Sequence, residues 1–287
     1  MSHRSFLRIG GLTIAVRCDD DRIRTDWHEP VSRFVVDAAP ADVDLEIRAA
    51  DALRASDAPV VFDSGFVWRM LRHEDGYRIE CRSEVFGEHP YKIATFDETF
   101  TRGVVTLRSD VLSLSPLDYP LDEVLMAHLL GRGRGVELHS CGVIDHHGRG
   151  RLFVGVSGAG KTTTARLWQD VASGIVSDDR VIVRERDGAM RMFGTPWHGE
   201  AELSLPSEVP LDEVYLLVQA TENAIRTMPR AAAVASLFRC TFPPFYDASA
   251  VEFTLAFLEK LVDTVPVREL HFVRDRSVVD LVLREAA

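Results

Sequence analysis

The sequence has few cysteines, few lysines and no long apolar run. Its cysteines are widely spaced and form no CxxC pair, so neither a zinc site nor a disulfide framework is indicated, and their use fits a reducing cytosol. Nowhere are there 18 continuous apolar residues, and the opening residues lack the apolar core and cleavage site of a signal peptide. We therefore expect a cytoplasmic protein with no membrane partner. The cysteines are Cys18, Cys81, Cys141 and Cys240.

Positive charge is also scarce. The chain of 287 residues has a formal net charge of -11, which argues against a nucleic-acid partner because phosphate backbones are bound by clustered Lys and Arg. Any anionic ligand must therefore be bound by a local arrangement. Only three of the 33 basic residues are lysines, a bias that we attribute to genome composition. One of the three, Lys161, lies in a glycine-rich segment described below.

The length suggests one or two domains, and the sequence pattern changes along the chain. Residues 1–118 are rich in short β-type runs, and Asp75-Gly76 is a tight-hairpin signal. A helix is predicted between Pro120 and Gly131. We place the boundary near this helix, with a β-rich region or lobe at 1–118 and a second domain at 119–287. An insertion or a lobe packed on a single core would give the same pattern.

The second part has the mixed pattern of an α/β fold. Apolar runs and turn residues predict strands over 135–144, 150–156, 174–179, 214–218 and 266–273, and a hairpin over 181–194. Helices are predicted from Lys161 to about Asp170 and over 252–262. Ser277 and Asp280 form a capping box for a last helix.

Residues Gly155 to Thr162 fit the pattern GxxxxGK[ST], and they follow a predicted strand and open a predicted helix. Glycines let successive backbone N–H groups point into one concavity, and the helix N-terminus favours an anion there. The pattern predicts that Lys161 reaches the β- and γ-phosphates of a nucleotide and that the Thr162 hydroxyl binds Mg²⁺. The predicted nucleotide-binding residues are Gly155, Ser157, Gly158, Ala159, Gly160, Lys161, Thr162 and Thr163.

Two adjacent carboxylates, Asp178 and Asp179, follow the next predicted strand. If that strand and strand 151–156 are parallel neighbours, both carboxylates lie at the sheet edge where open α/β sheets bind ligands. One would hold Mg²⁺ and the other would accept a proton from an attacking hydroxyl. We assign the metal to Asp178 and Thr162 and leave open which aspartate is the base. Side chains of neighbouring residues in an extended chain point to opposite sides, so both act only if the backbone turns there.

The run "ELHSCGVIDHHGRGRLFVGVSGAGKTTTARLW" followed by "VSDD" resembles the HPr kinase/phosphorylase family, specifically over residues 136–180. The resemblance implies a P-loop kinase core of the phosphoenolpyruvate-carboxykinase-like type that phosphorylates a serine hydroxyl with Mg²⁺. It assigns Asp178 and Asp179 to metal and base, and His139 to the histidine beside the site. The sequence is closest to kinase-like proteins of ribosomal-peptide pathways, and the resembled family tends to form homo-oligomers.

Three further features have both a functional and a structural interpretation. Trp197, His198 and Glu200 in "FGTPWHGE" belong either to a substrate loop or to a turn with a packed tryptophan. His139 contacts phosphate or carries a proton, or it is an ordinary strand histidine. Residues 242–247, "FPPFYD", line an acceptor groove or form a rigid turn.

The sequence therefore predicts an enzyme that uses ATP, or another nucleotide, and Mg²⁺ to phosphorylate a serine-type hydroxyl of a protein or peptide. The catalytic set is Lys161, Asp178, Asp179 and His139. Two alternatives remain: a kinase of a small hydroxyl compound, such as free serine or a sugar, and a nucleotide-binding regulator without phosphoryl transfer.

Overall fold

The computed structural model describes residues 3–23 and 27–285 and has a mixed α/β fold that is mostly sheet. The chain divides into two compact units, one with residues 1–8 and 12–129 and the other with residues 9–11 and 130–287. We predicted a boundary at residue 118, and the compact units divide after Leu129. The helix that we placed at the start of the second domain, α1 (Leu121–Leu129), therefore belongs with the first unit.

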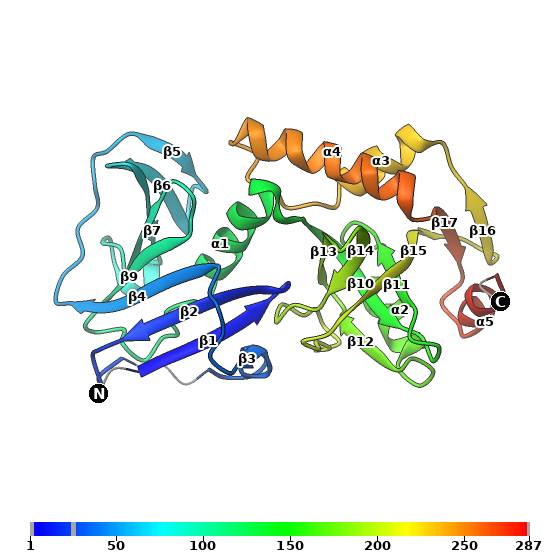
Figure 1. The fold of residues 1–287 in the computed structure, drawn as a ribbon, viewed down its shortest axis with the longest axis horizontal. Coiled ribbons are helices and arrows are strands. Elements are labelled where there is room, and N and C mark those ends of the chain that lie inside the picture. The colour runs from blue at the N-terminus through cyan, green and yellow to red at the C-terminus, as the bar shows by residue number, and fades with distance from the viewer. Residues whose placement is uncertain (1–2, 24–26, 286–287) are drawn as a thin grey trace. The chain divides into compact units, whose positions relative to one another are not determined.

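The first unit is built on one sheet with the strand order β3-β1-β2-β4-β9-β8-β7-β6-β5 (Figure 1). Asp75 and Gly76 lie at the β6–β7 hairpin, as their sequence indicates. In the central strand β4, one row of side chains, Val43, Leu45 and Ile47, is buried, because alternate side chains point to opposite faces of the sheet. The strands are β1 His3–Ile9, β2 Leu12–Cys18, β3 Val35–Val36, β4 Val43–Ala50, β5 Val60–Asp63, β6 Trp68–His73, β7 Gly76–Cys81, β8 Lys92–Asp97 and β9 Arg102–Arg108.

The second unit contains two sheets that share the strands β10 and β15. One sheet has the order β12-β10-β11-β15-β17-β16, and the other pairs β10, β13, β14 and β15. Its strands are β10 Val136–Ile144, β11 Gly150–Val154, β12 Gly174–Ser177, β13 Arg180–Arg186, β14 Ala189–Phe193, β15 Glu208–Gln219, β16 Ala224–Thr227 and β17 Val267–Phe272. Its helices are α2 Lys161–Trp168, α3 Arg230–Phe238, α4 Ala248–Thr264 and α5 Ser277–Glu285.

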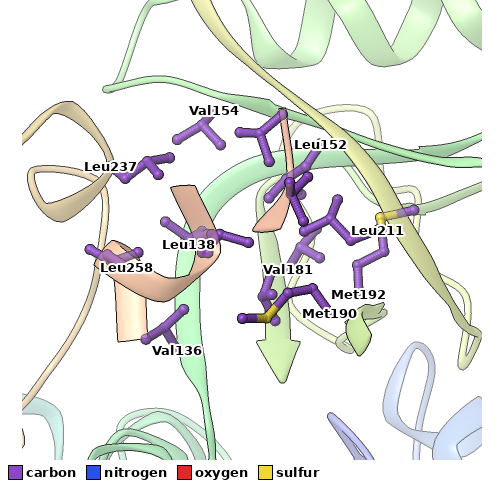
Figure 2. Packing of buried hydrophobic residues seen from close by; sticks show 14 of the residues in the cluster. Val136, Leu138, Leu152, Val154, Val181, Met190, Met192, Leu211, Leu237 and Leu258 are labelled. Carbon is purple, nitrogen blue, oxygen red and sulfur yellow. The ribbon is translucent and has the colours of Figure 1, made fainter. Parts of the chain in front are cut away.

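Helices cover both faces of the first of these sheets. On one face, Trp168 of α2 and Val279 of α5 join a buried cluster with Phe153 of β11. On the other face, Leu237 of α3 and Leu258 of α4 pack against Leu138, Leu152 and other strand residues (Figure 2). The strands between them are nearly continuous apolar runs because they are buried on both faces.

The predicted elements of the second part are present, with one difference in topology. Strands β11 and β12 run in the same direction, but β10 lies between them and is antiparallel to both. They are therefore not the parallel neighbours that we assumed. Their carboxyl ends still lie at the same edge of the sheet, and the amino-terminal half of β10 reaches that edge as well.

Within the described residues, the structure contains no helix of the length and apolar character needed to cross a membrane.

Candidate active site

The segment Gly155–Gly160 forms a loop between β11 and the first turn of α2, as its pattern predicts. Gly158 and Gly160 have φ values of 79° and 115°, the left-handed region that favours glycine. A Cβ on Gly155 would lie 2.6 Å from the Cβ of Ala159, so the loop curls too tightly for a side chain there. The loop therefore has the curled backbone that phosphate binding requires.

Lys161 is the first residue of α2, and its amine is held inside the loop. Its Nζ donates to the carbonyl of Gly155 at 3.1 Å and to that of Val156 at 3.4 Å. The residue is 6% exposed, and this burial lowers the pKa of the ammonium, against the opposing charge of Asp179. The lysine charge is thus positioned at the loop before any ligand binds.

Asp179 lies at the same edge and forms a pair with His139. His139 Nε2 and Asp179 Oδ1 are 3.1 Å apart. This hydrogen bond, with the charges of Arg180 and Lys161, holds the pKa of the Asp179 carboxyl below its ordinary value although burial opposes the shift. Asp179 is therefore ionised at neutral pH, close to the P-loop lysine. The backbone is fixed too, because Ser140 N donates to the Asp179 carbonyl at 2.8 Å.

Asp178 points to another environment. Its carboxylate is 1% exposed and accepts hydrogen bonds from the backbone N–H groups of Gly199 and Ala201, each at 2.9 Å, and of Leu203 at 3.3 Å. A Cβ on Gly199 would lie 2.8 Å from Asp178 Oδ2, so the loop approaches the carboxylate closely. Asp178 thus anchors the loop that contains the predicted substrate residues.

Two hydroxyl groups strengthen the junction between this loop and the aspartate pair. Ser177 Oγ donates to the carbonyl of Trp197 at 2.9 Å and accepts from the N–H groups of Asp179 and Arg180, each at 3.1 Å. Thr195 Oγ1 donates to the carbonyl of Arg180 at 2.6 Å. These bonds set the turn that sends Asp178 and Asp179 to different sides.

Phe242 lies on the far side of the histidine. Its ring is 5.9 Å from that of His139, edge on, and the guanidinium of Arg180 lies 4.4 Å from its centre. Arg180 also bonds to Glu137 Oε1 at 3.1 Å, and its Nε is 3.5 Å from Asp179 Oδ2. Phe245, three residues later, is 63% exposed. The "FPPFYD" segment therefore begins beside the His139–Asp179 pair and continues into exposed apolar surface.

The residues at this edge fit a nucleotide with Mg²⁺. The tightly curled loop, the buried Lys161 and the hydroxyl of Thr162 in the first turn of α2 match the groups that hold nucleotide phosphates and their metal. Across 3–23 and 27–285, no three or more His, Cys, Asp or Glu side chains gather as a metal site. Mg²⁺ bound with phosphates usually takes only one or two protein carboxylates, so the predicted set of Thr162 and one aspartate needs no such cluster.

The predicted residues are divided by the structure into two groups. Lys161, Asp179 and His139 meet at the loop, whereas Asp178 with Trp197, His198 and Glu200 belongs to the junction beside it. The side chain of His198 is exposed, and its Nδ1 lies 3.0 Å from the Gly199 carbonyl. The Mg²⁺ role of Asp178 stays a prediction. A shallow hollow of about 650 Å³ lies in the first unit, between residues such as Arg17, Glu46 and Arg102, and contains none of the predicted site residues.

Sequence reasoning missed several contributors. Ser177, Thr195 and Arg180 have no catalytic pattern, although Ser177 and Arg180 directly flank the aspartate pair. Gln219 and Phe272, whose contacts with the loop are described below, come from strands far along the chain. Only strand pairing reveals those two, because no local pattern links them to the P-loop.

No protein-family model matches this chain, and no curated protein matches its sequence.

Proposed function

We propose that this protein is a kinase of the P-loop type that transfers a phosphoryl group from a nucleotide, ATP first, to a serine-type hydroxyl. The observation that carries the proposal is that the loop lysine and the Asp179–His139 pair lie at one sheet edge, where the charges of Lys161 and Asp179 act on each other's pKa. A protein that only binds a nucleotide needs a carboxylate for Mg²⁺. The second carboxylate and the histidine bonded to Asp179 favour the kinase over such a regulator.

The residues have separate tasks in this proposal. Backbone N–H groups of the loop and the Lys161 ammonium neutralise the charge that develops on the phosphoryl oxygens during transfer. Asp179 orients the acceptor hydroxyl and takes its proton, and His139 holds the carboxylate through the 3.1 Å contact. Mg²⁺, when bound with the nucleotide near Thr162 and, as predicted, Asp178, would supply further positive charge and orient the phosphates.

A protein or peptide acceptor is favoured by the surface around Asp179. Phe242 packs against His139 and Arg180, and Phe245, three residues later and in ring contact with Phe238, is 63% exposed. Exposed aromatic surface next to a reactive pair is typical of places that a polypeptide covers. The phosphoenolpyruvate-carboxykinase-like core implied by the family resemblance is part of the same proposal.

The test is phosphoryl transfer by the full chain from Mg-ATP to a pool of serine-containing peptides, read by mass spectrometry. We expect a phosphoryl-sized mass addition with the wild type and none with Asp179→Asn. Asp187→Asn is the matched control, because Asp187 lies at the β13–β14 turn, away from the loop. Transfer to a small alcohol but to no peptide would move the function to a metabolite kinase, and ATP binding without any transfer would contradict the kinase.

A further inference from the structure

On the side of the P-loop away from Asp179, the sheet continues with the parallel strands β15 and β17. Strand β11 pairs with β15, and β15 pairs with β17, all in parallel, so the segments that follow them emerge at one edge. In sheet order, that edge has the Asp179–His139 pair over β12 and β10, the P-loop over β11, and then the ends of β15 and β17. Neighbouring strands are about 4.8 Å apart, so β17 lies about 10 Å across the sheet from β11. By the strand register, β17 extends three residues beyond the level at which β11 ends.

Contacts tie the P-loop to the ends of β15 and β17. Gln219 Nε2, at the end of β15, donates to the carbonyl of Gly158 at 2.7 Å. The ring of Phe272, at the end of β17, packs against Gly160: a Cβ added to Gly160 would lie 2.5 Å from Cζ of that ring. The segment that follows β17 therefore begins directly beside the P-loop.

The segment Val273–Arg276 is held in one conformation by its neighbours. Asn223 Oδ1 accepts from Val273 N at 2.7 Å, and Asn223 Nδ2 donates to Ser277 Oγ at 2.6 Å. Asp275 turns toward α5, where its Oδ1 accepts from Ser277 N at 2.9 Å. Arg274, Asp275 and Arg276 are all exposed, and because Asp275 is bonded to Ser277, the two arginines are the cationic groups that this segment offers in a protein with a net charge of -11.

Phosphoryl transfer places the attacking and leaving oxygens roughly in line with the phosphorus. The acceptor hydroxyl is expected at Asp179, on the β10 side of the P-loop, so the leaving nucleotide must extend away from it. Across the P-loop from Asp179 lie β15 and β17, and the segment directly after β17 contains the exposed residues Arg274 and Arg276. Arginine recognises phosphate oxygens through paired donors and stacks on planar rings.

We propose that the loop Val273–Arg276 binds the nucleoside end of the donor nucleotide, with Arg274 and Arg276 as its contacts to the α-phosphate and the nucleoside. This inference rests on the proposed function, because the direction of the nucleotide follows from Asp179 as the acceptor site. The loop is ordered by Asn223 before binding, so a ligand does not have to order it.

The test is equilibrium binding of Mg-ATP and of Mg-pyrophosphate to the full chain, by calorimetry. We expect the double variant Arg274→Gln/Arg276→Gln to weaken ATP binding by roughly tenfold to a hundredfold. Its affinity for pyrophosphate should stay within about twofold of wild type, because pyrophosphate occupies only the P-loop. Lys161→Ala should weaken the binding of both ATP and pyrophosphate. Weaker pyrophosphate binding in this variant would confirm that pyrophosphate binds at the P-loop.

A matched control removes the same charge elsewhere. Arg226→Gln/Arg284→Gln changes one arginine on β16 and one in the last turn of α5, both exposed and farther from the edge. Equal loss of ATP affinity in the two double variants would mean that the loss comes from the lower total positive charge and not from contacts of Arg274 and Arg276. That result would overturn the inference. Wild-type affinity in Arg274→Gln/Arg276→Gln would also overturn it, while leaving the kinase intact. A wild-type chain that binds no ATP would overturn the proposed function and this inference together.

Discussion

Asp178 and Asp179 are adjacent in the chain, but their carboxylates contact different parts of the structure. The Asp178 carboxylate is buried against three backbone N–H groups of the loop 199–203, whereas that of Asp179 pairs with His139 beside Lys161. The Ser177 hydroxyl, which accepts from the two N–H groups after Asp178, holds the turn that separates them. Asp178 thus has an anchoring contact that its sequence did not predict, and the metal and base roles of the pair stay predictions.

Substitution of Asp178 should therefore affect stability first. Asp178→Ala leaves three buried N–H groups without their acceptor, and we expect a loss of about 3 kcal/mol in the free energy of unfolding. Asp179→Asn should abolish transfer and lower that free energy by less than Asp178→Ala does, because the amide oxygen still accepts from His139 and only the charge is lost. Urea unfolding of both variants distinguishes them, and equal unfolding free energies would contradict the anchoring role of Asp178.

Lys161→Ala should lower the rate of phosphoryl transfer by about a hundredfold to a thousandfold, because a preorganised charge at the phosphates is lost. The fold should remain, since the amine contacts only two loop carbonyls. Steady-state kinetics and circular dichroism measure the two effects. Lys260→Ala, an exposed lysine of α4 whose partner is Glu185, is the control and should keep full activity. Full activity in Lys161→Ala would contradict the phosphate assignment.

The His139–Asp179 contact predicts a shift in the pH dependence of activity. The hydrogen bond from His139 is the largest cause of the lowered pKa of Asp179. Without it the pKa rises, and because the ionised carboxylate is the active form, the acid limb of the kcat profile should move to higher pH. His139→Ala and the exposed control His146→Ala, compared across the acid range, test this. An unmoved limb in His139→Ala would show that the histidine does not set the charge of the base.

Gly160→Ala should abolish ATP binding. Gly160 has a φ of 115°, and its new Cβ would lie 2.5 Å from the Phe272 ring, so both the backbone and the packing must move. Gly188→Ala is the matched control, since Gly188 has a φ of 77° in the β13–β14 turn with no heavy atom within 4 Å of a new Cβ. We expect the control to lose about 1 kcal/mol of stability and no affinity. Unaltered ATP affinity in Gly160→Ala would show that this backbone shape is dispensable.

The order of elements in the second unit follows from local sequence. Turn residues and apolar runs located β10, β11, the P-loop, α2 and the β13–β14 hairpin, because each depends on neighbours within a few residues. The boundary was harder to place, since the helix α1 has no local feature that says which unit it packs against. Its side chains join the first unit only through non-local contacts.

By itself, the sequence determined the phosphate-type loop, with its glycines, Lys161 and Thr162, and the aspartate pair one helix and one strand later. These are local patterns that need only the strand, loop and helix around them. Only the tertiary structure decided that β10 lies between β11 and β12, that Asp179 pairs with His139 while Asp178 is bound by the loop 199–203, and that Gln219 and Phe272 contact the glycine-rich loop. The physical reason is that these contacts join strands far apart in the chain, whose pairing is set by burial of whole sheet faces and not by any short run of residues.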